Sequence, residues 1–178
     1  MKLASGGLPD SSTGADPIRT WTEERAGVSR TVEVFGDGSR AWVDVEQPVV
    51  IEPAGQSRKG ESIGGCRAAS GVGAWWYYDC RVSRKDTISE AGFVVDYKTT
   101  NLRGGLAEVR DPRGGFCKVY AGTCSAKAPS VVRGKQNGAS PARAKMSYSG
   151  RLSANAMSVN GEIWLDVHRM TRTVHSTP

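Results

Sequence analysis

The four cysteines are the residues of this 178-residue chain whose type and spacing most clearly predict chemistry. They fall into two close pairs, Cys66 with Cys80 and Cys117 with Cys124. Disulfides persist in oxidising compartments, where small domains use them to supplement a modest core. Four cysteines allow three connectivities, and pairing within each close pair is the simplest of them. We therefore predict two local disulfides and a secreted or extracytoplasmic protein.

Two other roles for the cysteines stay open at this point. A zinc site usually places its cysteines closer together, as in C-x-x-C, and often recruits histidines. The chain has two histidines, His168 and His175, far along the sequence. We therefore expect no metal and no cofactor. Free buried thiols are the remaining alternative, and they would suit a protein assembled in a reducing compartment.

Basic residues are concentrated in the last third of the chain. Residues 112–178 hold ten lysines and arginines against two acidic residues, whereas the net charge of the whole chain is +6. No acidic residue occurs between Asp111 and Glu162, so we expect the basic residues of this interval to be uncompensated. They are Arg113, Lys118, Lys127, Arg133, Lys135, Arg143, Lys145 and Arg151.

Clustered cations beside glycine and serine suit phosphate or sulfate groups. We expect residues 127–145 to bind an anionic partner, and the candidate contacts are Arg133, Lys135, Arg143 and Lys145, together with Arg113 and Lys118. The partner would be an acidic polymer, a glycan or a protein surface, and nucleic acid also fits this charge. The alternative is that these charges only keep the loops solvated.

The aromatic run Trp75-Trp76-Tyr77-Tyr78 lies just before the second cysteine. In a strand, Trp75 and Tyr77 face one way and Trp76 and Tyr78 face the other. One pair is expected in the core, and the other is either covered or exposed as a stacking platform for sugars, bases or a protein. Trp75 and Trp76 are therefore candidate binding residues, with packing of both pairs as the alternative.

Catalytic patterns find little support in the sequence. It contains no nucleophile elbow, phosphate loop or zinc-protease helix signature. We expect His168 to be an ordinary strand residue rather than a general base, and His175 to lie in a frayed tail. Asp37-Gly38 and Asp111-Pro112 indicate turns rather than calcium ligands. A protein without enzymatic activity is expected, and a small hydrolase whose carboxylates meet only in space is the least favoured class.

Alternation of apolar and polar residues predicts seven to nine short strands and no convincing helix. The firmest element is a β-hairpin over residues 28–46, centred on Gly36-Asp37-Gly38-Ser39. Further strands are expected at 49–51, 75–83, 91–100, 106–110, 116–120, 145–152 and 163–170. Turns are expected at 111–115 and at Asn160-Gly161, and long loops at 54–74 and 125–144.

This pattern is typical of an all-β antiparallel sandwich, Ig-like or jelly-roll-like, with long Gly-rich loops. We expect a flexible N-terminal arm over residues 1–20, a single domain over 21–174 and a frayed tail over 175–178. No run of about 18 apolar residues encodes a membrane span. The start of the chain, from Met1, also lacks the apolar core of a signal peptide.

Two functions fit these observations. The first is a non-enzymatic, extracytoplasmic β-domain that binds an anionic polymer, a glycan or a protein surface through basic loops. The alternative is a virion structural protein, a phage or viral capsid or tail component, that assembles with itself or with neighbours. Its thiols would start free, because such proteins assemble in a reducing cytosol.

Overall fold

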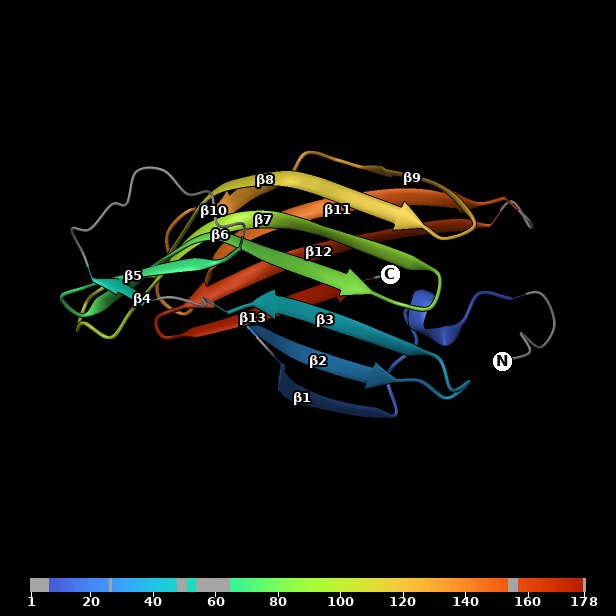
Figure 1. The fold of residues 1–178 in the computed structure, drawn as a ribbon, viewed down its shortest axis with the longest axis horizontal. Coiled ribbons are helices and arrows are strands. Elements are labelled where there is room, and N and C mark those ends of the chain that lie inside the picture. The colour runs from blue at the N-terminus through green and yellow to red at the C-terminus, as the bar shows by residue number, and fades with distance from the viewer. Residues whose placement is uncertain (1–6, 26, 48–50, 54–64, 154–156, 178) are drawn as a thin grey trace.

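The computed structural model describes residues 7–25, 27–47, 51–53, 65–153 and 157–177, and these form two β-sheets packed face to face (Figure 1). The predicted fold class, an all-β antiparallel sandwich, is confirmed. The one helical element among the described residues is the short 3-10 turn η1, Asp10–Ser12. None of the described elements is a helix of the length and apolarity that a membrane span needs.

Among the described residues, eight strands form the first sheet and five form the second. The first sheet contains β1 Arg19–Arg25, β2 Val28–Val34, β3 Arg40–Glu46, β4 Ile51–Pro53, β5 Arg67–Gly71, β6 Ala74–Lys85, β7 Ser89–Thr100 and β8 Glu108–Val119. The second contains β9 Gly122–Ala126, β10 Ser130–Arg133, β11 Ala142–Leu152, β12 Ser158–His168 and β13 Thr171–Thr177.

Long strands organise both sheets. One edge of β6 pairs with β5 through residues 74–78 and with β3 through residues 82–85, while β7 runs along its other edge. The order β1-β2-β3 therefore continues into β6, β7 and β8. In the second sheet, β11 pairs with β9 and β10 on one edge and with β12 on the other. Within the described ranges, β4 and β5 pair in parallel and the other strand pairs are antiparallel.

The core lies between the sheets and follows the alternation of the strands. From the first sheet it takes Phe93, Val95 and Tyr97 of β7, and from the second it takes Ile163 and Leu165 of β12, all fully buried. Each such large apolar side chain contributes roughly 1.5–3 kcal/mol by leaving water. The alternation of apolar and polar residues therefore predicts correctly which side chains of these strands face the core.

Both predicted disulfides form, Cys66–Cys80 and Cys117–Cys124. The first joins the residue before β5 to β6 within one sheet, and the second joins β8 of the first sheet to β9 of the second. No free cysteine remains. This arrangement is compatible with an extracellular protein.

One predicted turn, at 111–115, is wrong because β8 runs through it. The strands expected at 106–110 and 116–120 are one strand, Glu108–Val119. Asp111 and Gly114 take positive φ angles of 49° and 60°, and the register with β7 shifts between Val94 and Asp96. A bulge absorbs the turn-forming residues without ending the strand.

The turn predicted at Asn160-Gly161 is also wrong, because both residues lie inside β12. A Cβ on Gly161 would meet the carbonyl oxygen of Thr177 and the hydroxyl of Tyr148, each at 2.5 Å. This glycine therefore permits a close approach of neighbouring groups rather than a change of chain direction. Sequence spacing alone does not distinguish the two uses of glycine.

Three strands lie where loops or a tail were expected. β5 lies within the loop predicted at 54–74, of which residues 54–64 are outside the described part of the chain. β10 and the start of β11 lie within the loop predicted at 125–144. β13 pairs with β12 up to Thr177, so His175 lies on a strand. Of the strand expected at 49–51, residues 49 and 50 are outside the described residues.

The described part of the expected N-terminal arm contacts the domain. Leu8 packs against the core. The backbone N–H of Asp10 donates to Asp37 Oδ2 at 3.0 Å, and that of Ser11 donates to Ser39 Oγ at 3.0 Å. Ser11 is fully buried. The small, polar residues of this N-terminal segment predict flexibility, but polar contacts to the β2–β3 turn hold its described part against the domain.

Candidate functional site

Two cations expected to be uncompensated, Arg143 and Lys145, are paired with acidic residues of β12. Arg143 donates two hydrogen bonds to Asp166, each 2.6 Å long, and Lys145 Nζ lies 2.6 Å from Glu162 Oε1. The hydrogen bonds to Asp166 raise the pKa of Arg143, and the one from Lys145 lowers the pKa of Glu162. The expectation that these cations lack partners is therefore wrong.

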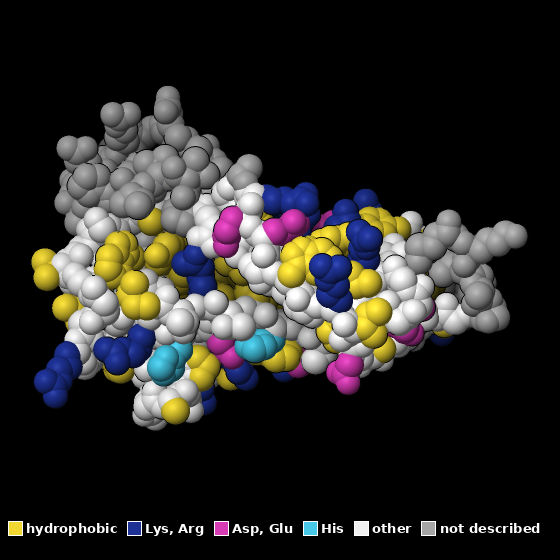
Figure 2. Space-filling model, turned by 90° about the horizontal axis from the view of Figure 1, so that it is seen from below, with side chains coloured by type: hydrophobic (Ala, Val, Ile, Leu, Met, Phe, Trp, Pro, Cys, Tyr) yellow, Lys and Arg dark blue, Asp and Glu magenta, His cyan; other side chains and the backbone are white. Residues whose placement is uncertain are grey.

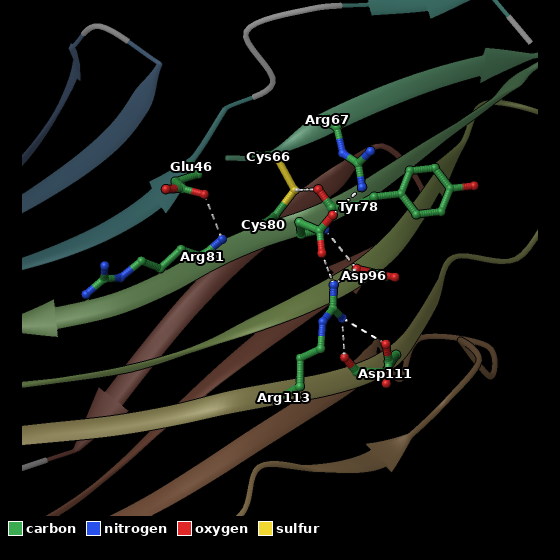
Figure 3. Close-up of polar contacts among 10 residues, drawn as sticks. Glu46, Cys66, Arg67, Tyr78, Cys80, Arg81, Asp96, Asp111 and Arg113 are labelled. Atoms are coloured by element: carbon green, nitrogen blue, oxygen red, sulfur yellow. Dashed lines mark hydrogen bonds and ion pairs between the residues drawn. A yellow bond between two sulfur atoms is a disulfide. The ribbon is translucent and has the colours of Figure 1, made fainter. Parts of the chain in front are cut away.

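Arg113 is paired as well, in a cluster of charged residues on the outer face of the first sheet (Figure 3). Its guanidinium binds Asp79 and Asp111, and its Nη2 lies 3.0 Å from Asp96 Oδ1. Arg67 binds Asp79 from β5. Burial alone would raise the pKa of Asp79, but the hydrogen bonds from Arg67 and Arg113 outweigh it and lower that pKa. Arg113 is therefore committed to this cluster.

The other predicted cations are exposed but do not gather in one place. Arg133 lies on β10 and donates to the carbonyl oxygen of Pro141 at 3.0 Å, and Lys135 follows that strand in the second sheet. Lys118 lies on β8 in the first sheet. Among the described residues none of these three makes an ion pair. The structure therefore does not unite the six cations predicted from sequence.

The aromatic run divides between the two faces of the first sheet. Tyr77 packs against the core and stacks on Tyr97, with ring centroids 4.6 Å apart, and Trp75 shares its face. On the outer face, Trp76 stacks on Tyr78 and is half-buried. The Arg110 guanidinium carbon lies 3.8 Å from the Trp76 ring centroid, so an arginine already covers this ring.

An open pocket lies further along the same outer face, at the end of the sheet that carries the β2–β3 turn. Its volume is about 450 Å³, and its lining residues are Gly38, Ser39, Arg40, Trp42, Lys85, Asp86, Thr87 and Tyr120. The strand pattern explains the two central side chains. Ala41 and Val43 of β3 are buried, so Trp42 faces outward, and Trp42 is the cross-strand partner of Lys85 on β6.

Tyr120, the residue after β8, forms the wall of the pocket opposite Trp42. Its backbone N–H donates to the carbonyl oxygen of Ile88 at 2.9 Å, which holds it beside the β6–β7 turn. The Nζ atoms of Lys85 and Lys118 lie 5.8 and 5.3 Å from its ring centroid. Register places Lys118 opposite Glu90, and Glu90 opposite Lys85. Two lysines from different strands thus flank one exposed aromatic ring.

The acidic residue that lines the pocket, Asp86, is held inside the domain by hydrogen bonds. Asp86 is buried and accepts hydrogen bonds from the backbone N–H groups of Ile88 and Ser89 and from the Ser89 hydroxyl, at 2.7–2.9 Å. Glu90 pairs with Arg81 at 3.4 Å. The charge that an incoming molecule would meet therefore comes from exposed cations.

Those cations are Arg40, Lys85 and Lys118, and within the described part of the chain none of them makes an ion pair. We call the lining residues Arg40, Trp42, Lys85 and Tyr120, together with Lys118 beside the Tyr120 ring, the cationic aromatic pocket. An aromatic wall beside cations that make no ion pair within the described residues can stack on a ring and bind its negatively charged substituents. Of its five members, sequence reasoning had singled out Lys118 alone.

The face of the domain that Figure 2 shows carries charges of both signs. On the face seen in Figure 2, lysine and arginine side chains lie scattered between hydrophobic ones, with acidic side chains among them. His175 stacks on Trp164 with centroids 5.4 Å apart, and His168 Nε2 lies 3.0 Å from Gln136 Nε2. In the described ranges, no three His, Cys, Asp or Glu side chains form a ligand set for a metal.

A comparison of this chain with protein-family models, with curated proteins and with solved structures found no match.

Proposed function

We propose that this domain binds an acidic glycan, a sugar polymer that carries sulfate or carboxylate groups, in the cationic aromatic pocket. The observation that supports the proposal is an open pocket lined by Arg40, Trp42, Lys85 and Tyr120, with Lys118 beside the Tyr120 ring. Among the described residues, none of these three cations makes an ion pair. Aromatic side chains supply rigid contact area for a ring, and charge-assisted hydrogen bonds fix its anionic groups. The volume of about 450 Å³ lies in the range of small-molecule sites.

The proposed setting is secreted or extracytoplasmic, and the proposed role is binding without catalysis. Two disulfides in a small domain support that setting, because they persist in oxidising compartments. Extracellular glycans are common acidic polymers, which makes them a more natural partner there than nucleic acid. A polynucleotide would also be less selective for the pocket, since phosphate contacts follow overall charge.

A structural role in a virion is the second candidate. The observation that favours it is the edge strand β10, whose Val131 and Val132 side chains are 42% and 56% exposed. Exposed apolar edge strands promote pairing with another chain. Light scattering over a range of protein concentrations tests this role, and a monomer throughout would argue against it.

Two triple variants with equal loss of charge test the proposed glycan site. Changing Arg40, Lys85 and Lys118 to Gln should weaken binding of a sulfated oligosaccharide by about 30-fold, since each exposed charge contact contributes roughly 0.7 kcal/mol. Changing Arg133, Lys135 and Arg151 to Gln removes the same charge elsewhere and should cost less than about threefold. Calorimetric titration measures both.

Equal losses in the two triple variants would contradict the pocket and would indicate binding by net charge alone. A larger loss of affinity in the second variant would indicate that the binding site includes Arg133 and Lys135, as the sequence analysis predicts. Titration with a single-stranded oligonucleotide of equal charge distinguishes an acidic glycan from nucleic acid, and tighter binding of the oligonucleotide would overturn the choice of ligand.

A further inference from the structure

The Asp111–Pro112 peptide bond lies at the bulge in β8, beside the charged cluster of Figure 3. Asp111 has a φ angle of 49°, a left-handed conformation that side-chain-bearing residues adopt at a cost. The preference of a residue before proline for extended backbone adds to this cost. The Asp111 side chain is 69% exposed, so water reaches its carboxylate.

Arg113 holds both reactive groups of Asp111 at once. Its Nη1 donates to the backbone carbonyl oxygen of Asp111 at 2.6 Å and lies 3.0 Å from the side-chain oxygen Oδ2 (Figure 3). That carbonyl oxygen belongs to the Asp111–Pro112 bond. Arg113 is in turn held by Asp79 of β6 and Asp96 of β7. A fixed guanidinium therefore turns the carboxylate and the carbonyl toward the same nitrogen.

From this geometry we propose that the Asp111–Pro112 bond is a self-cleavage site. A carboxylate oxygen of Asp111 attacks the carbonyl carbon of the same residue and closes a five-membered ring. The backbone oxygen becomes an oxyanion, which the Arg113 guanidinium stabilises as an oxyanion-hole donor does. The bond to the Pro112 nitrogen breaks, and that nitrogen takes a proton from water. The hydroxide left by that water opens the cyclic anhydride and leaves two free carboxyl groups on Asp111.

Proline makes this route the favourable one. Aspartate followed by other residues commonly reacts through the next backbone nitrogen to give a succinimide, and that path needs an N–H which proline lacks. The tertiary nitrogen of proline also accepts a proton readily as it departs. The net reaction consumes one water molecule and needs no oxidant, reductant or metal.

Cleavage would produce fragments 1–111 and 112–178 within an intact fold. Cys66–Cys80 lies wholly in the first fragment and Cys117–Cys124 wholly in the second, so neither disulfide joins them. The two halves of β8 keep their pairing with β7, through Arg110 opposite Asp96 and Arg113 opposite Val94. The product is a nicked domain that separates only on denaturation.

The chain contains its own reference bond, Asp16–Pro17. Asp16 is exposed and has no positive φ angle, and among the described residues it makes no ion pair with an arginine. Mass spectrometry of the folded full chain in mildly acidic buffer should show cleavage after Asp111 at least about tenfold faster than after Asp16. In guanidinium chloride at the same pH, the two bonds should cleave at similar rates.

Cleavage after Asp111 that is no faster than cleavage after Asp16 in the folded chain would overturn the proposal. So would a rate that is unchanged by unfolding. Asp111→Asn keeps a residue that tolerates positive φ but removes the nucleophile, and it should stop fast cleavage. Arg113→Lys keeps a positive charge beside Asp79 and Asp96 but loses the planar guanidinium with its several N–H donors. Cleavage after Asp111 in this variant should slow to the rate of the reference bond. The proposal is independent of the glycan site.

Discussion

Changing Arg84 to Ala is expected to destabilise the domain by about 3–5 kcal/mol, the usual cost of removing one partner from a buried charged network. The Arg84 side chain is 4% exposed. Its Nη1 donates to Ser176 Oγ at 2.6 Å and to Glu33 Oε2 at 3.3 Å, and its Nη2 donates to the carbonyl oxygen of Ser11 at 2.8 Å. One guanidinium thus ties together β2, β13 and the N-terminal segment.

The measurement is urea denaturation of the variant beside a matched control. Arg81 lies three positions earlier on the same strand, is exposed and makes an ion pair with Glu90 at 3.4 Å. Arg81→Ala should cost less than about 1 kcal/mol, as exposed ion pairs do. Similar losses for both variants would contradict the role given to Arg84. Hydrogen exchange at Ser11 and Ser12 should accelerate in Arg84→Ala alone, because that segment loses its anchor.

Changing both Cys66 and Cys80 to Ala is expected to cost about 3 kcal/mol of unfolding free energy. The two cysteines are 14 residues apart, and closing a loop of that length restricts the unfolded chain. Cys117 and Cys124 are 7 residues apart, so the same change there should cost less, about 2.5 kcal/mol. Urea midpoints of the two double variants, compared with the wild type, test the size and the order of the losses.

Together the two losses approach the whole stability of a marginal domain, about 5–15 kcal/mol. The reduced protein should therefore be largely unfolded at about 37 °C, and that result would support the proposed oxidising compartment. An unchanged midpoint after complete reduction would remove this support. Alkylation of the reduced sample confirms that all four thiols have been released.

Local sequence patterns predicted correctly those strands that a few neighbouring residues are enough to specify. The hairpin of β2 and β3 is an example, because the alternation on both sides and Asp37-Gly38 between them act together. The same kind of signal failed at Gly161, where the glycine makes room for Tyr148 and the end of β13. It failed at Asp111-Pro112 because pairing with β7 carries the strand through a bulge. Both errors come from contacts that are distant in sequence.

The candidate site depended still more on distant contacts. Charge counted along the sequence left Arg143 and Lys145 without partners, but antiparallel pairing places both beside carboxylates of β12. Lys85 and Trp42 become neighbours only through the β3–β6 register. The outward direction of Trp42 was readable from its alternation with Ala41 and Val43. The cation beside Trp42 could not be predicted, because local sequence patterns do not determine the order of strands in a sheet.

The most direct test of the cationic aromatic pocket is a map of backbone amide NMR shifts during titration with a sulfated oligosaccharide. We expect the largest changes at Arg40, Trp42, Lys85, Lys118 and Tyr120, and small changes on β9, β10 and β11. The Arg40, Lys85 and Lys118 triple variant should lose these changes while its other resonances stay in place. Shifts centred on Arg133 and Lys135, or no shifts at saturating oligosaccharide, would contradict it.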